Sequence, residues 1–316
     1  MNFSNPLDIF KKWNNNKLDV QNARIFSNQN TKQQVDSLIK TSPWNASQPI
    51  DMRSYSPYFN VPNDCADNPG PGLHKFLSDI EKSQHDPEYP EFYYNINDLG
   101  FRDYYPCTTE SNIIGFFGCS FTWGEGLDTT TNFPHLVSSH FHCPHLNFGV
   151  GGTGAQRIAL TFAAAANIWP MEIAVITLPN WARFHYVDSI GNLKRIHLPF
   201  KISRSDELEI VRQSLISSFS DQYMLSMTKD AINYMLTVAK LKNIKLVLAS
   251  WDFDTRAIIK GITEKSAVEY ELWNNNYAEF KRLKTPGMFA RDMSHPGTIL
   301  AKNYADTLIK HIENLH

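Results

Sequence analysis

The chain has 316 residues, of which 42% are hydrophobic and 20% are charged, a composition typical of a soluble globular protein with one large domain or a core domain plus an extension. Its 30 basic and 32 acidic residues give a formal net charge of −2, which argues against nucleic acid or a membrane surface as a partner. We expect a cytoplasmic location, because we find no secretory signal, no apolar run of membrane-spanning length and no CxxC spacing among the four cysteines.

Residues 1–92 form a predicted N-terminal extension or small accessory region. This part is rich in Asn, Gln, Ser, Pro and Asp. Two short helices are predicted in it, at Leu7–Trp13 and Thr31–Ile39, and the Pro- and Gly-punctuated stretch Pro57–Pro71 predicts a loop. The core domain is predicted to span residues 93–316.

In the core domain, short apolar runs alternate with helical patterns. The predicted strands are Tyr93–Asn97, Ile113–Phe117, His145–Val150, Ile173–Leu178 and Ile244–Ser250. The predicted helices are Phe133–Phe141, Ala155–Asn167, Leu208–Lys242 and Thr298–Asn314, and Trp181–Asp206 is a polar stretch between elements. This alternation predicts an α/β fold with a parallel sheet, in which ligands bind outside the carboxyl ends of the strands.

Four candidate positions fall just past predicted strand ends: Ser120, Gly152, Asn180 and Trp251-Asp252. Because the carboxyl ends of parallel strands share one edge of the sheet, we expect these residues to lie near one another. Their agreement across four separate loops is stronger evidence for a site than any single motif.

Near the C-terminus, Asp292-Met293-Ser294-His295 places a carboxylate and an imidazole three residues apart. Such a pair can act as a general base, in which the aspartate fixes the tautomer of the histidine. Pro296 and Gly297 follow and are expected to hold this loop in a defined turn. The alternative is a loop carboxylate beside a histidine that merely precedes a helix.

Ser120 is the candidate nucleophile for this base. It follows a buried apolar strand, and the flanking Gly118 and Gly124 permit a tight strand-to-helix turn. A serine in this position can also serve only as a helix cap. The run does not match the G-x-S-x-G elbow of α/β-hydrolases.

Two further segments offer hydrogen-bond donors to an oxyanion. The glycine-rich run Gly149–Gly154 can supply a backbone N–H group, and Asn180 can supply a side-chain amide. The glycine-rich run can instead be a flexible turn or a nucleotide-phosphate loop, although it lacks both standard phosphate-loop patterns. Asn180 can instead be only a turn residue. The histidines and cysteine between His135 and His145 have no standard zinc spacing, so no metal is predicted.

Taken together, these blocks resemble the SGNH (GDSL-type) hydrolase family. The matching segments, in chain order, are Gly118-Cys119-Ser120, Asn147–Gly152, Asn180 and Asp292–His295. The resemblance implies a three-layer α/β/α sandwich, flavodoxin-like, with a mostly parallel central sheet. It also implies Ser120, Asp292 and His295 as catalytic residues, and Ser120, Gly152 and Asn180 as the oxyanion hole.

The chain departs from the family pattern in two blocks. The usual Gly-Asp-Ser reads Gly118-Cys119-Ser120, and the usual Gly-x-Asn-Asp reads Leu178-Pro179-Asn180-Trp181, which keeps only the asparagine. Gly149 is an alternative to Gly152 as the backbone donor. Arg183 is an alternative to Asn180 as the group that binds a substrate oxygen.

The resemblance implies ester hydrolysis through an acyl-enzyme, with no metal or organic cofactor. We expect activity to fall on acidification as His295 protonates, near the ordinary histidine pKa of about 6.5. Trp123, Trp181, Trp251 and Arg183 are expected to contact the substrate, a small-molecule or glycan ester, and the tryptophans favour O-acetyl groups on a carbohydrate. The alternatives are an O-acyltransferase that uses the same serine and a non-catalytic glycan-binding or structural protein. The sequence does not indicate the oligomeric state.

Overall fold

The chain divides into two compact units, residues 1–51 and 52–316. The computed structural model describes residues 72–74, 92, 94–97, 100–102, 112–187, 193–197, 221–263, 266–270 and 285–315, all in the second unit. The helices predicted at Leu7–Trp13 and Thr31–Ile39, and the loop predicted at Pro57–Pro71, lie outside the described residues, so they stay predictions.

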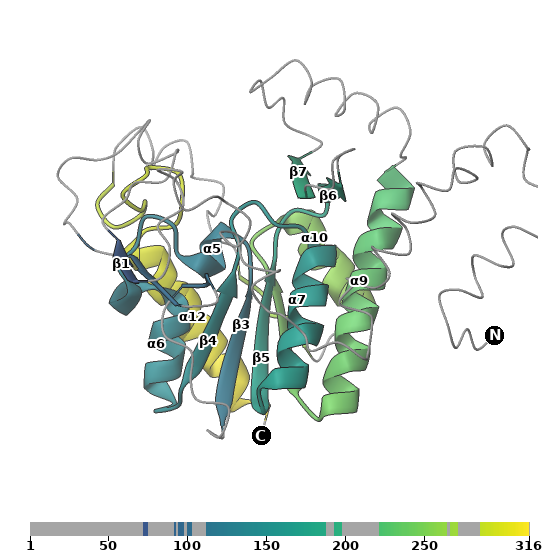
Figure 1. The fold of residues 1–316 in the computed structure, drawn as a ribbon, viewed down its shortest axis with the longest axis horizontal. Helices are drawn as coiled ribbons and strands as arrows, with labels where there is room; N and C mark the ends of the chain where they lie inside the picture. Colours follow the sequence, from purple (N-terminus) through teal and green to yellow (C-terminus); the bar gives the residue numbers. More distant parts are fainter. Residues whose placement is uncertain are drawn as a thin grey trace, which may run out of the picture. The chain divides into compact units, whose positions relative to one another are not determined.

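A four-stranded parallel sheet forms the centre of the second unit (Figure 1). Its strands are β3 (Ile113–Gly118), β4 (His145–Gly149), β5 (Met171–Leu178) and β8 (Lys245–Ser250), in the spatial order β4-β3-β5-β8. In chain order this is 2-1-3-4, the order of flavodoxin-like folds. From β3 the chain continues to β4 on one side, and from β5 it continues to β8 on the other side. The topological switch point therefore lies between the carboxyl ends of β3 and β5, which Ser120 and Asn180 follow in the chain.

Helices cover both faces of the sheet, as a three-layer α/β/α sandwich requires (Figure 1). The helices α7 (Ala155–Ile168) and α9 (Asp221–Lys242) lie on one face, and α6 (Phe133–His140) and α12 (Thr298–Glu313) lie on the other. The helix α10 (Phe253–Ile262) packs against β8 and α9. None of the helices in the described part of the chain combines the length and the apolar character that crossing a bilayer requires.

The central strand β3 is apolar along its whole length because both of its faces are covered by helices. All six of its residues are buried, because successive side chains face opposite helical layers. The ring of Phe116 lies 5.9 Å from that of Phe133 on α6, whereas the ring of Phe117 lies 5.3 Å from that of Phe162 on α7.

Most predicted elements are confirmed to within two residues, but some elements of the structure were not predicted. The stretch predicted as polar, Trp181–Asp206, contains an antiparallel hairpin of β6 (Arg183–Val187) and β7 (Leu193–His197). The helix α10 was not predicted. Of the long helix predicted from Leu208, the structure describes the part from Asp221. The strand β1 (Gly72–His74), which was not predicted, lies in the predicted extension and pairs with β2 (Tyr94–Ile96) of the predicted core domain.

Arg102 fixes the segment that follows the candidate nucleophile. Its side chain is fully buried, and its guanidinium donates to the carbonyl oxygens of Trp123 (2.8 Å), Gly124 and Leu127. It also lies over the rings of Tyr94 and Trp123, with 4.8 and 5.3 Å from Cζ to the ring centres. One buried cation thus donates hydrogen bonds to several backbone carbonyl groups in a segment that belongs to no β-sheet.

We expect Arg102→Leu to lower the free energy of unfolding by about 3 kcal/mol, because buried carbonyl groups lose a charged donor. Urea denaturation measures this. Lys302→Met is the control, since it removes a cation from an exposed pair with Asp306 and should cost less than about 0.5 kcal/mol. Equal losses in the two variants would contradict the role assigned to Arg102.

Candidate active site

Ser120, His295 and Asp292 form a continuous hydrogen-bonded relay. The Oγ of Ser120 lies 2.8 Å from Nε2 of His295, and Nδ1 of His295 is hydrogen-bonded to the carboxylate of Asp292. All three residues are buried, with Asp292 fully so. This is the geometry of a nucleophile, a base and the group that orients the base.

The strand-to-helix turn after β3 places Ser120 at the start of α5 (Ser120–Trp123). Cys119 is the N-cap residue of this short helix, so Ser120 is not its cap. Its hydroxyl instead bonds to His295. The structural alternative for this serine is therefore excluded.

The loop before α12 holds the Asp292–His295 pair in a fixed shape. One carboxylate oxygen of Asp292 accepts from the backbone N–H groups of Ser294 (3.0 Å) and His295 (2.9 Å), which leaves the other oxygen for the imidazole. Met293 adopts a left-handed conformation, with φ of 55°. Gly297 then serves as the N-cap residue of α12. The expectation of a positioned imidazole is thus met by local hydrogen bonds.

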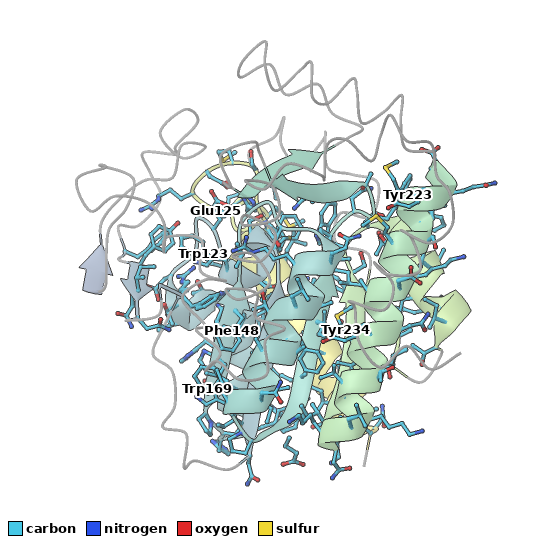
Figure 2. The ribbon with its side chains drawn as sticks, turned by 45° about the vertical axis from the view of Figure 1, so that its right-hand side comes forward. Trp123, Glu125, Phe148, Trp169, Tyr223 and Tyr234 are labelled. Carbon is cyan, nitrogen blue, oxygen red and sulfur yellow. The ribbon has the colours of Figure 1, made fainter. Side chains whose placement is uncertain are left out.

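A second carboxylate, that of Glu125, lies on the other side of the imidazole. Its Oε2 is 3.6 Å from Nε2 of His295, and only 12% of its side chain is exposed. No motif in the sequence points to this residue. In Figure 2, Glu125 and Trp123 lie above Phe148 and Trp169.

The two carboxylates raise the proton affinity of the His295 imidazole. Burial by itself would lower the pKa of His295, but the hydrogen bond with Asp292 and the negative charges of Glu125 and Asp292 outweigh it and raise the pKa above 6.5. Burial would likewise raise the pKa of Asp292, but its hydrogen bonds with His295 and Ser294 lower it below 3.8. Asp292 therefore stays ionised beside the imidazole.

Glu125, Asp292 and His295 are also the group of possible metal ligands in the described part of the chain. The contacts do not favour an ion, because both ring nitrogens of His295 already face hydrogen-bond partners. The relay accounts for the closeness of Asp292 and His295.

The structure distinguishes between the two candidate glycines of the oxyanion hole. The N–H group of Gly149 donates to Oδ1 of Asn147 at 3.0 Å, and a Cβ built on Gly149 would lie 2.2 Å from the nitrogen of Trp123, so this glycine serves close packing. Gly152 is exposed and left-handed, with φ of 70°, and its N–H group has no partner among the described residues. Gly152 is therefore the donor that remains available.

The side chain of Asn180 is oriented by two hydrogen bonds. Its Oδ1 accepts from the backbone N–H group of Ala182, and its Nδ2 donates to Oδ1 of Asp252, both at 2.9 Å. The other oxygen of Asp252 caps α10 through Thr255. An amide nitrogen carries two hydrogens, so Asn180 keeps one for a ligand. Asp252 was expected only as a residue at a strand end, and its part in holding Asn180 was missed.

The expected substrate-binding residues divide into two sets. Trp123 was expected to contact the substrate, but it is only 4% exposed and packs in the core against Tyr94, with 4.6 Å between the ring centres. Trp251 is partly exposed, and its ring lies 5.0 Å from that of Phe121, which in turn lies 5.4 Å from the imidazole of His295. The guanidinium of Arg183 lies over the ring of Trp251, with 5.2 Å from Cζ to the ring centre. Trp181 is partly exposed, and its carbonyl oxygen accepts from Thr228.

An apolar pocket adjoins the relay. Its wall includes His295 and Glu125 and is otherwise dominated by rings and aliphatic groups, among them Phe121, Leu127, Trp251, Tyr270, Leu300 and Tyr304. An apolar group of a ligand can therefore lie against the imidazole on this side.

No protein-family model and no curated protein matches the chain. It is similar to solved structures that include a psychrotrophic esterase from Pseudoalteromonas sp. (11% identity, TM-score 0.41, covering 65% of this chain and 98% of that one). Two others are an acetyl xylan esterase from Butyrivibrio proteoclasticus (14%, 0.40, 67% and 66%) and a member of the lipolytic protein G-D-S-L family from Veillonella parvula (12%, 0.37, 64% and 97%).

The raised pKa of His295 predicts the pH dependence of the site. Only the neutral imidazole can accept a proton, and its fraction falls as the pH drops through a pKa that lies above 6.5. Glu125→Gln removes a negative charge that stabilises the imidazolium, so the pKa should fall. NMR titration of His295 measures both effects without requiring a substrate.

Glu172→Gln is the matched control, because this glutamate lies at the amino end of β5 and pairs with Lys245. It should leave the titration of His295 unchanged. A pKa at or below 6.5 in the parent protein, or no decrease in Glu125→Gln, would contradict the electrostatic account.

Proposed function

We propose that this protein is a serine carboxylic ester hydrolase of the SGNH (GDSL) type. The observation that carries the proposal is the buried relay in which the Oγ of Ser120 lies 2.8 Å from Nε2 of His295 and Asp292 binds the opposite ring nitrogen. The sequence blocks around these residues match the family in order. The parallel α/β sandwich is the fold that the resemblance implies.

In the proposed mechanism, Ser120 attacks the ester carbonyl while His295 takes its proton through Nε2. Asp292 keeps the proton on Nδ1 and stabilises the imidazolium. The backbone N–H groups of Ser120 and Gly152 and the amide of Asn180 stabilise the tetrahedral oxyanion. His295 then protonates the leaving alcohol, and water activated by the same nitrogen releases the acid from the acyl-enzyme.

The proposed substrate is an O-acetyl group on a carbohydrate. Trp251 supports this choice because it is partly exposed and connects to His295 through the ring of Phe121. Aromatic faces suit the apolar faces of sugar rings, as they do other flat ligand surfaces. The complete relay favours an enzyme over a non-catalytic binding protein that keeps a degenerate hydrolase fold.

Ser120→Ala should abolish hydrolysis of p-nitrophenyl acetate, with a loss on the order of 10⁶-fold where chemistry limits the rate. A fluorophosphonate probe should add its mass to Ser120 in the parent protein only. Ser139→Ala is the control, since Ser139 is exposed on α6 and makes no contact with the relay among the described residues. Equal hydrolysis rates for Ser120→Ala and the parent protein would contradict the proposed esterase activity. An acetyl group transferred to an acceptor sugar, in place of free acetate, would identify an acyltransferase that uses the same serine.

Asn180→Ala should lower kcat about 100- to 1,000-fold, because it removes a donor to the oxyanion. Asn167→Ala is the matched control: this exposed asparagine at the end of α7 bonds to the carbonyl of Ala163 within its own helix. Steady-state kinetics on p-nitrophenyl acetate compare the two variants. A change in KM without a change in kcat would assign Asn180 to ground-state binding instead.

A further inference from the structure

Polar side chains without partners gather beside the glycine-rich loop after β4. Buried atoms with no hydrogen-bond partner among the described residues include Oγ1 of Thr153, both amide atoms of Gln156, and Nε and Nη1 of Arg183. Nε1 of Trp251 is in the same state. Buried polar atoms are normally paired, so a cluster of orphaned ones calls for a physical explanation.

These residues meet around Gly154, which directly follows Thr153 in the chain. A Cβ built on Gly154 would lie 2.2 Å from the backbone carbonyl oxygen of Arg183 and 3.4 Å from Oε1 of the Gln156 side chain, so the backbone of Arg183 and the side chain of Gln156 border the same glycine. The guanidinium carbon of Arg183 lies 5.2 Å from the centre of the Trp251 ring. Gln156 and Arg183 are only partly buried as whole residues, which leaves them access to the surface.

The cluster adjoins the relay. From Arg183, ring contacts run through Trp251 and Phe121 to the imidazole of His295. The backbone N–H group of Arg183 donates to the carbonyl oxygen of Asn180 at 3.2 Å. A substrate bound at Ser120 can therefore extend over Trp251 towards the guanidinium.

The chemistry of the cluster favours an anion. Arg183 carries a permanent charge, and among the described residues no carboxylate lies within ion-pair distance of it. The orphaned groups are mostly donors, and the arginine fork matches the geometry of a carboxylate. The amide of Gln156 and the hydroxyl of Thr153 add both donors and acceptors, which suits a carboxylate that is attached to a hydroxyl-bearing group.

We propose that Arg183, Gln156 and Thr153 form a subsite that binds a carboxylate group of the substrate. A sugar acid within an acylated glycan carries such a group on the alcohol side of the ester, and a dicarboxylic half-ester carries it on the acyl side. This inference deepens the proposed function and rests on it for the placement of the ester at Ser120. The subsite itself can be tested by binding, which requires no chemistry.

The test uses the full chain with Ser120→Ala, so that no turnover occurs, and isothermal titration with two matched ligands. Trigalacturonate carries free carboxylates, and its methyl-esterified form has the same sugars without the charge. We expect trigalacturonate to bind more tightly than the methyl ester. Adding Arg183→Gln should weaken trigalacturonate binding about 10- to 100-fold, as for loss of a hydrogen bond to a charged group, and leave the methyl ester unchanged.

Lys240→Gln is the control for net charge, since this exposed lysine lies in the last turn of α9. It should preserve the preference for trigalacturonate. Succinate is titrated in parallel, and binding of succinate alone that depends on Arg183 would place the carboxylate on the acyl group. The subsite is overturned if neither anion binds in a manner that depends on Arg183. Failure of the esterase itself would appear separately, as equal hydrolysis by the parent protein and Ser120→Ala.

Discussion

The site depends on one long-range hydrogen bond, between Oγ of Ser120 and Nε2 of His295, residues that are 175 positions apart in the chain. A hydrogen bond tolerates only a few tenths of an ångström, so the helix that follows His295 must pack at a fixed position on the sheet. α12 does so through an apolar cluster with α6 and alternate residues of the strands, and Tyr304 anchors it by a 2.7 Å bond to Thr177 on β5. The core thus positions the chemistry.

The same buried setting makes the charges around His295 effective. Asp292 and Glu125 lie against opposite nitrogens of one imidazole, where little water screens them. Asp292 is held by its own loop, whereas Glu125 belongs to the segment that Arg102 secures through carbonyl groups. The arginine therefore supports the geometry of the base indirectly, although it does not contact the relay.

The surroundings of the relay are chemically unequal. On one side lies an apolar pocket with Tyr270 and Leu300 in its wall. The polar groups of Asn180, Arg183 and Gln156 are not part of this wall. An ester has two different ends, so such an asymmetry gives each end a distinct environment. The partly exposed indole of Trp251 lines the apolar pocket and also contacts the guanidinium of Arg183.

The sequence by itself determined the parallel α/β fold and the edge on which Ser120, Gly152 and Asn180 lie, because apolar runs and helical periodicity are local properties of the chain. It did not reveal the hairpin of β6 and β7, whose pairing depends on a partner strand rather than on an apolar run. Only the tertiary structure decided that Trp123 faces the core and that Glu125 faces His295. The direction of a side chain beside a nucleophile, and the pKa that results, depend on which distant segments pack around it, and no spacing in the sequence encodes that.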